Sequence, residues 1–143
     1  MNDNVKLLQS CHRGTITAVN SIEQVMDHVQ SRELKTRLQD TLERHKSIGE
    51  EIDTRLNNHG AEGKEPGAMA RMSVWMTTEM RMMMDTDHDH QIAKLVINGC
   101  NTGIQSLSED INRLSDVSGE CMDLATSLIT EEQRLMDDLR MYL

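Results

Sequence analysis

The chain has 143 residues, enough for one domain, and carries 24 acidic against 15 basic side chains, a formal net charge of −9. Phe is absent, and Trp75 and Tyr142 are the only Trp and Tyr residues. Nucleic-acid binding requires an excess of Lys and Arg, and single-strand binding usually requires aromatic side chains that stack on bases. We therefore expect no nucleic-acid partner. The scarcity of aromatic residues also argues against a β-sandwich or a β-barrel.

We expect neither a membrane span nor a secretion signal in this chain. No apolar run approaches the ~18 residues that span a bilayer, and the first ten residues lack the basic and apolar regions of a signal peptide. Cys11, Cys100 and Cys121 are odd in number and far apart, which does not fit a disulfide framework or a zinc knuckle. We expect a cytoplasmic protein with three reduced, buried thiols and no membrane contact.

Apolar and small residues recur at alternating intervals of three and four along four stretches, which is the pattern of helices in a bundle. Pro66 and the neighbouring glycines break the chain in the middle. The sequence predicts an all-α, ferritin-like four-helix bundle that forms a single domain over 1–143. Its helices are expected at about 3–30, 32–58, 87–115 and 119–141.

The two predicted helix hairpins resemble each other in sequence. At a shift of 89, residues 7–25 align with residues 96–114 and three positions are identical: Cys11 and Cys100, Gly14 and Gly103, Ile22 and Ile111. We interpret this as the duplication of one hairpin. A glycine inside a helix costs about 1 kcal/mol relative to alanine, so we expect Gly14 and Gly103 to permit close approach of two helices.

The connection between the hairpins, from about 59 to 87, is far longer than a usual helix–helix turn. It is long enough to run the length of the bundle, and we expect a short Met-rich helix at about 67–84 within it. Two hairpins joined by one long crossover have the connectivity of ferritin-like bundles.

The chain resembles a family of uncharacterised, ferritin-like bacterial proteins whose helices open with an L-x-x-C-x-x-G element. The similarity lies in LLQSCHRG (7–14), in the run 34–52, in KLVINGCNTGI (94–104) and in the closing helix 125–143. Because members of that group are largely uncharacterised, the resemblance implies a ferritin-like fold and little chemistry.

A ferritin-like di-iron site takes a Glu from each of two helices and a Glu-x-x-His motif from each of the other two. Leu42 precedes His45 by three residues and Leu135 follows Glu132 by three, so neither motif is present. We predict a degenerate relative that lacks the di-iron ligand set and ferroxidase activity.

His45 and Glu132 remain as polar residues on apolar stripes. We interpret them as a pair across the core, with a mononuclear iron site as the alternative. Adjacent acidic residues, Glu131 with Glu132 among them, point to different faces of a helix, and we interpret such pairs as solvated.

His45 and Gly49 also have the His-x-x-x-Gly spacing of histidine-phosphotransfer modules, which are four-helix bundles of similar size. Ile48 stands where that family has Lys, and phosphotransfer requires an exposed His, whereas His45 lies on the apolar stripe. A phosphotransfer-like module that uses His45 is the second alternative function.

Methionines crowd the connection between the hairpins, and five of them form one helical stripe: Met69, Met72, Met76, Met80 and Met83. Their thioethers, with the imidazoles of His88 and His90, have the donor chemistry that favours Cu(I). Met also packs adaptably at interfaces, and we prefer packing against the bundle or a second subunit.

Familiar catalytic motifs, such as G-x-S-x-G or a Walker loop, are absent from the sequence. We therefore expect a non-enzymatic protein that acts through contact with an unidentified protein partner, forms a homodimer and holds no cofactor. The alternative is a metal-handling or redox protein with a degenerate iron site or a Met-rich copper site.

Overall fold

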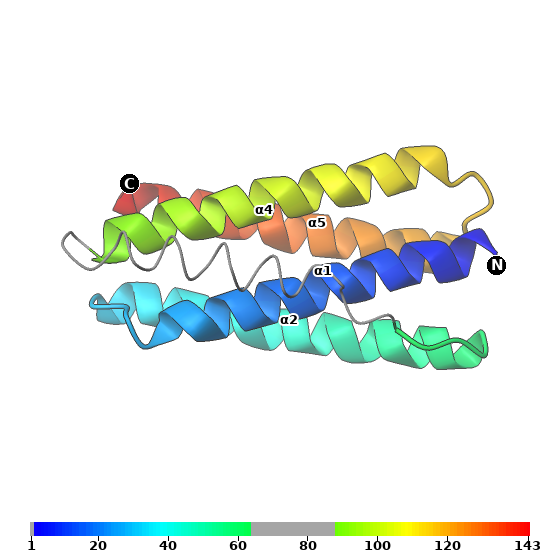
Figure 1. The fold of residues 1–143 in the computed structure, drawn as a ribbon, viewed down its shortest axis with the longest axis horizontal. Helices are drawn as coiled ribbons and strands as arrows, with labels where there is room; N and C mark the ends of the chain where they lie inside the picture. Colours follow the sequence, from blue (N-terminus) through cyan, green and yellow to red (C-terminus); the bar gives the residue numbers. More distant parts are fainter. Residues whose placement is uncertain (1, 64–87) are drawn as a thin grey trace.

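The computed structural model describes residues 2–63 and 88–143. In these ranges the chain forms four α-helices and a short 3-10 helix: α1 (Asp3–Met26), α2 (Arg32–Asn58), α4 (His88–Arg113), α5 (Gly119–Leu139) and η1 (Arg140–Tyr142). The helices pack side by side as an all-α four-helix bundle (Figure 1). The helix expected at 67–84 and the five-methionine stripe lie outside the described residues. Within them, no helix combines the length and apolarity that crossing a membrane requires.

Short polar side chains begin three of the helices. Asn2 accepts a hydrogen bond from the N–H of Val5 at the start of α1, and Ser31 and Ser118 cap α2 and α5 in the same way. Each of these three helices also has an acidic residue in its first turn, where the helix dipole favours negative charge. Ser31 and Ser118 are 87 residues apart, so the second helix of each hairpin starts with the same signal.

The two hairpins lie antiparallel to each other along the bundle. The side chain of Gln9 donates to the carbonyl of Glu62 at 3.0 Å, which places the end of α2 beside the start of α1. The carboxylate of Asp89 accepts the N–H groups of Gln30 and Ser31, which places the start of α4 at the opposite end. The connection between the hairpins therefore joins the two ends of the bundle, as its length led us to expect (Figure 1).

Side chains at the start of each hairpin hold the turn of the other. Asp89 binds the turn between α1 and α2, and α1 therefore ends at Met26, earlier than the expected residue 30. Asp3 accepts the N–H groups of Ser115 and Asp116 in the turn between α4 and α5 at 3.2 and 3.1 Å. These reciprocal contacts relate the hairpins by an approximate two-fold axis.

In the structure, the equivalent positions of α1 and α4 differ from the predicted alignment by one helical turn. A shift of 85, and not 89, brings five pairs of buried residues into register: Leu7 and Ile92, Leu8 and Ala93, Cys11 and Val96, Thr15 and Cys100, Ile22 and Leu107. The predicted shift was wrong because four residues are close to the 3.6 of one turn, so both shifts keep the apolar stripes in phase. The three identities at shift 89 do not mark equivalent positions.

The core consists of two apolar clusters, one toward each end of the bundle. One contains Ile22, Leu38, Ile92 and Leu135, and the other contains Leu8, Ile52, Leu107 and Leu128, each with further members. Along α2 and α5, polar side chains separate the two clusters.

Close helix–helix approach occurs at a glycine that the sequence did not single out for packing. A Cβ at Gly49 would lie 3.0 Å from the Cγ2 atom of Thr15 on the facing helix α1. A Cβ at Gly14 would make only an ordinary contact, 3.7 Å from Leu128, and one at Gly103 would meet nothing within 4 Å. The expectation for Gly103 was wrong.

Candidate functional site

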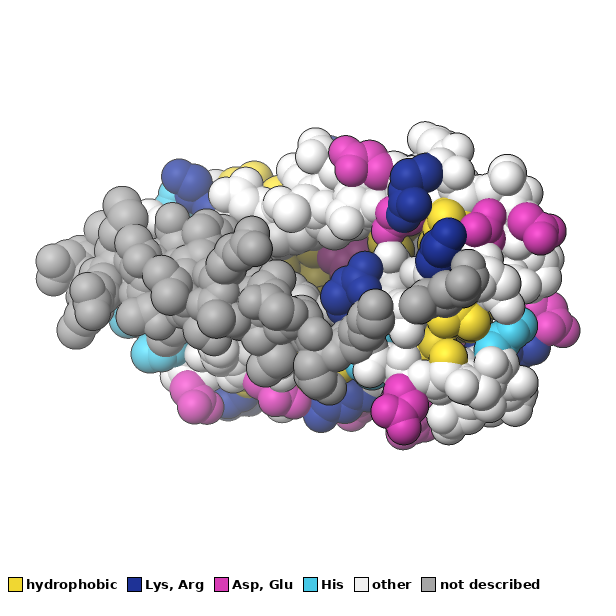
Figure 2. Space-filling model, turned by 45° about the vertical axis from the view of Figure 1, so that its right-hand side comes forward, with side chains coloured by type: hydrophobic (Ala, Val, Ile, Leu, Met, Phe, Trp, Pro, Cys, Tyr) yellow, Lys and Arg dark blue, Asp and Glu magenta, His cyan; other side chains and the backbone are white. Residues whose placement is uncertain are grey.

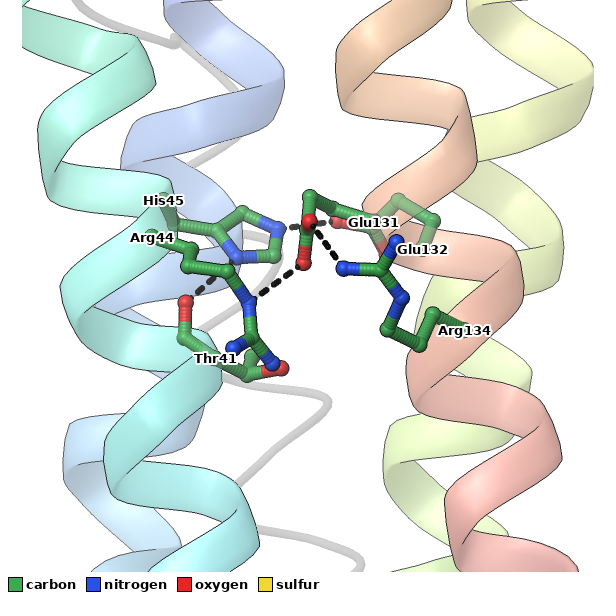
Figure 3. A network of polar contacts seen from close by, with 6 residues as sticks. All are labelled: Thr41, Arg44, His45, Glu131, Glu132 and Arg134. Atoms are coloured by element: carbon green, nitrogen blue, oxygen red, sulfur yellow. Dashed lines mark hydrogen bonds and ion pairs between the residues drawn. The ribbon is translucent and has the colours of Figure 1, made fainter.

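A layer of polar side chains crosses the middle of the bundle between α2 and α5. We call it the central polar layer, and it consists of Thr41, Arg44, His45, Glu131 and Glu132 (Figure 3). His45 is fully buried, and Glu131 and Glu132 are only 8 % and 7 % exposed. Because buried polar groups are costly unless they are bonded, their partners decide what the layer can do.

Both ring nitrogens of His45 are engaged. Nδ1 lies 2.8 Å from the carbonyl oxygen of Thr41, and Nε2 lies 2.5 Å from Oε1 of Glu132. A carbonyl only accepts, so Nδ1 carries a proton and donates it to Thr41. The contact with Glu132 then contains one further proton, held by Nε2 or by the carboxyl group. The predicted pairing of His45 and Glu132 is present in the structure.

The environment favours the protonated form of His45. Burial is the largest single influence on its pKa and lowers it. The hydrogen bond and charge of Glu132, the carbonyl of Thr41 and the charge of Glu131 act in the other direction, and the pKa of His45 lies above its ordinary value. The pair is therefore best described as a buried imidazolium–carboxylate ion pair.

Cys100 on α4 lies beside the same carboxylate. Burial, followed by the nearby charge of Glu132, raises the pKa of its thiol. Burial likewise raises the pKa of Cys11 to about 12. A thiol is nucleophilic only as the thiolate, so neither cysteine is activated. All three cysteines are free and buried.

Glu131 joins the layer to the surface. Its two carboxylate oxygens accept from Arg44 on α2 and Arg134 on α5, both at 2.8 Å (Figure 3). We expected Glu131 to face solvent, and this was wrong, because the two arginines cover it. Sequence reasoning identified His45 and Glu132 but missed Glu131 and Cys100. An acidic residue facing a basic residue of another helix leaves no short-range pattern.

The layer does not have the geometry of a phosphotransfer site. Such a site requires an exposed His with an unbonded nitrogen, whereas His45 is fully buried and bonded at both nitrogens. The space beside Gly49, the glycine of the His-x-x-x-Gly spacing, is filled by the side chain of Thr15 on the neighbouring helix α1. The phosphotransfer interpretation of His45 was wrong.

Metal ligation has little support in the described part of the chain, which contains no group of three or more His, Cys, Asp or Glu side chains placed to hold a metal ion. His88 and His90 lie at the start of α4, away from the central polar layer. The ring of His88 packs edge-on against that of His28, with centroids 6.3 Å apart. The iron candidates His45 and Glu132 lie together, but no third ligand of these types joins them within the described residues. The methionine candidates for copper lie outside the described residues.

A charged groove of about 610 Å³ lies along α2 and α5 toward the C-terminal end of the chain, and we call it the α2–α5 groove. Its lining is Arg32, Glu33, Thr36, Arg37, Asp40, Arg44 and Asp138. Arg37 forms ion pairs with Glu33 and Asp138 at 3.1 and 3.3 Å. Its Nε atom is nevertheless buried without a partner, as is the hydroxyl of Tyr142.

Charged side chains of both signs are interspersed on the described part of the face shown in Figure 2. Large hydrophobic side chains are exposed at two described positions, Met141 (62 %) and Leu143 (56 %). Met141 lies in η1, which directly follows α5 and the groove residue Asp138.

Comparison with models of known protein families identifies the family of this chain. A family model described as a domain of unknown function (DUF2383) matches residues 3–113, which are 111 of the 143 residues, and the chain belongs to this family. The match covers α1, α2 and α4 and ends before α5, which supplies Glu131 and Glu132. Searches of curated proteins and of solved structures found no significant match.

Proposed function

We propose that this member of the DUF2383 family is a bacterial, ferritin-like bundle of the cytoplasm that carries out no catalysis and acts through protein–protein contact. Its first partner is a second copy of itself. The observation that carries the proposal is the α2–α5 groove, whose lining holds arginines and acidic residues in equal number.

The groove suits a second copy because its charges are self-complementary. Three arginines and three acidic residues line it: Arg32, Arg37, Arg44, Glu33, Asp40 and Asp138. In a two-fold symmetric contact the same patch meets itself, so the arginines of one copy can face the carboxylates of the other. Arg and Met are also enriched at protein interfaces.

The central polar layer supports a role without catalysis. His45 is bonded at both nitrogens, Glu132 is bonded to His45, and burial raises the pKa of the Cys100 thiol. A general base needs a nitrogen or oxygen within reach of substrate, and here these atoms face each other inside the core. The layer is thus built for structure.

Light scattering coupled to size-exclusion chromatography tests the homodimer. We expect twice the chain mass of 16.3 kDa at micromolar concentration, and the mass of one chain for Arg37→Glu. The matched control is Lys94→Glu, the same charge reversal at an exposed position of α4, which should leave the dimer intact. A monomeric wild type would refute the homodimer, and a dimeric Arg37→Glu variant would refute the groove as its interface.

The proposal includes no resident metal, and elemental analysis after separate loading with iron, copper and zinc tests that part. We expect no stoichiometric retention after desalting. Retained iron would assign a metal-handling role to His45 and Glu132. Retained copper would assign one to the segment from Met69 to His90.

A further inference from the structure

Two contacts between α2 and α5 join residues that hold equivalent positions in the two hairpins. Arg44 contacts Glu131 and His45 contacts Glu132, and each pair is 87 residues apart. The same interval separates the capping residues Ser31 and Ser118. A residue that touches its own equivalent lies on the axis that relates the two halves. The central polar layer therefore lies on the approximate two-fold axis of the bundle.

Most other features of the interface between the hairpins are shared by both halves. Several core positions on α2 and their equivalents on α5 are apolar: Leu34 and Cys121, Leu38 and Ala125, Ile48 and Leu135, Ile52 and Leu139. The contacts that hold the turns also occur in both halves. Apolar character and turn contacts alone would therefore not exclude packing of the first hairpins of two chains on each other.

Ion pairs away from the axis would not oppose the packing of two first hairpins on each other either. Arg55 pairs with Glu120, whose equivalent in the first hairpin is Glu33, another acid. Arg37 pairs with Asp138, whose equivalent is Glu51, again an acid. Two first hairpins packed together would therefore keep opposite charges at both places.

Only the contacts on the axis would change from opposite charges to like charges. Two first hairpins packed on each other would bring Arg44 against Arg44 and His45 against His45. Two second hairpins would bring Glu131 against Glu131 and Glu132 against Glu132. Like groups at the buried positions of His45 and Glu132 must either repel each other or be neutralised by proton loss or uptake, and either outcome costs free energy and disfavours the wrong complex.

We infer that the central polar layer is a pairing selector, which makes the hairpin of residues 3–58 dock on the hairpin of residues 88–142 and not on a copy of itself. The partner of this face is always the unlike hairpin, whether it belongs to the same chain or to a second copy. His45 is fully buried and Glu132 nearly so, hence solvent screens their interaction little.

Neutralising the axis tests the selector. The variant R44Q/H45L/E131Q/E132L carries the same uncharged residue at each pair of equivalent positions. The contacts on the axis are then the same whether a hairpin packs on its like or on its unlike partner. Full-length chains are unfolded in urea, refolded by dilution and weighed by light scattering. We expect the variant to refold into species of several masses, and the wild type to return to the single mass it had before unfolding.

The matched control is R55Q/E120Q, which removes an ion pair between the hairpins away from the axis. It should refold to one mass, as the wild type does. A neutral-axis variant that also returns to one mass would overturn the inference.

A second experiment decides the question if the neutral-axis variant does not fold. H45E places two carboxylates on the axis, and E132H places two imidazoles there. Refolded together, with tags of different size, the two chains should form a mixed dimer by hairpin exchange, because both axial contacts are then His with Glu. The double variant H45E/E132H restores the pair within one chain and should refold as the wild type does. Separate refolding of H45E and E132H without a mixed species would overturn the selector.

Discussion

Removal of one partner from the buried pair is the sharpest test of the central polar layer. His45→Leu keeps an apolar side chain of similar size in the core but leaves the carboxylate of Glu132 without its cation. In the wild type that carboxylate lies 2.5 Å from His45 and is 7 % exposed. An unpaired charge at such a position makes the loss of one partner cost about 3–5 kcal/mol.

The carboxyl group of Glu132 can avoid this penalty only by taking up a proton. At pH 7, protonating a group with an ordinary pKa near 4.3 costs about 1.4 kcal/mol per pH unit, ~3.7 kcal/mol in all. We therefore expect His45→Leu to lower the free energy of unfolding by about 3–4 kcal/mol at pH 7. Because the folded state of this variant binds the extra proton, its stability rises as the pH falls.

Urea unfolding followed by far-ultraviolet circular dichroism measures both effects. The control for pH is the double variant H45L/E132L, which lacks the carboxyl group and should not gain stability in this way; its stability should match or exceed that of the wild type. The control for position is His59→Leu, at an exposed site, with an expected change within about 0.5 kcal/mol. A loss below about 1 kcal/mol for His45→Leu at pH 7, or a loss that does not change with pH, would refute the buried ion pair.

Three further outcomes follow from the geometry. The pKa of His45 is raised in the folded protein, so its contribution to stability is complete below its unfolded pKa of about 6.5 and is lost as the pH rises through the folded value. The thermal midpoint of the wild type should therefore decrease as the pH is raised above neutral. The midpoint of H45L/E132L should not decrease in this way. Gly49→Ala should lower stability in urea, because its Cβ would press on Thr15, whereas Gly103→Ala, in open space, should gain about 1 kcal/mol; equal effects would contradict the packing. Burial and the raised pKa of Cys11 and Cys100 predict that a thiol reagent modifies no cysteine in the folded protein and all three in urea, and rapid labelling before unfolding would contradict this.

The bundle follows from local patterns in the sequence, and its finer register does not. Apolar stripes and capping serines specify four helices and their buried faces. The end of α1 was placed too late because the carboxylate of Asp89, far along the chain, binds the turn that follows. The alignment of the halves was wrong by one turn because periodicity repeats at that interval.

The candidate site was predictable only in the part that departs from a local pattern. His45 and Glu132 stand out because each interrupts an apolar stripe. Glu131 looked like an ordinary surface acid, since nothing near it in sequence indicates that Arg44 crosses from the facing helix to cover it. Cys100 looked like a small core residue, and its position beside Glu132 depends on the packing of α4 against α5. Contacts between helices decide these roles.

The position of the buried charges gives a reason for keeping them. An ion pair inside a core is weak evidence for stability, since well-packed apolar residues of similar volume often stabilise as much or more. A duplicated hairpin has a different requirement, because its two halves must recognise each other while their faces remain alike. Off the axis, each contact joins two positions that are not equivalent in the two halves. Opposite charges can therefore remain in contact in a wrong pairing, as Arg55 and Glu33 would. On the axis each residue meets its own equivalent, and a change of charge between the halves there separates right from wrong pairing with only two contacts.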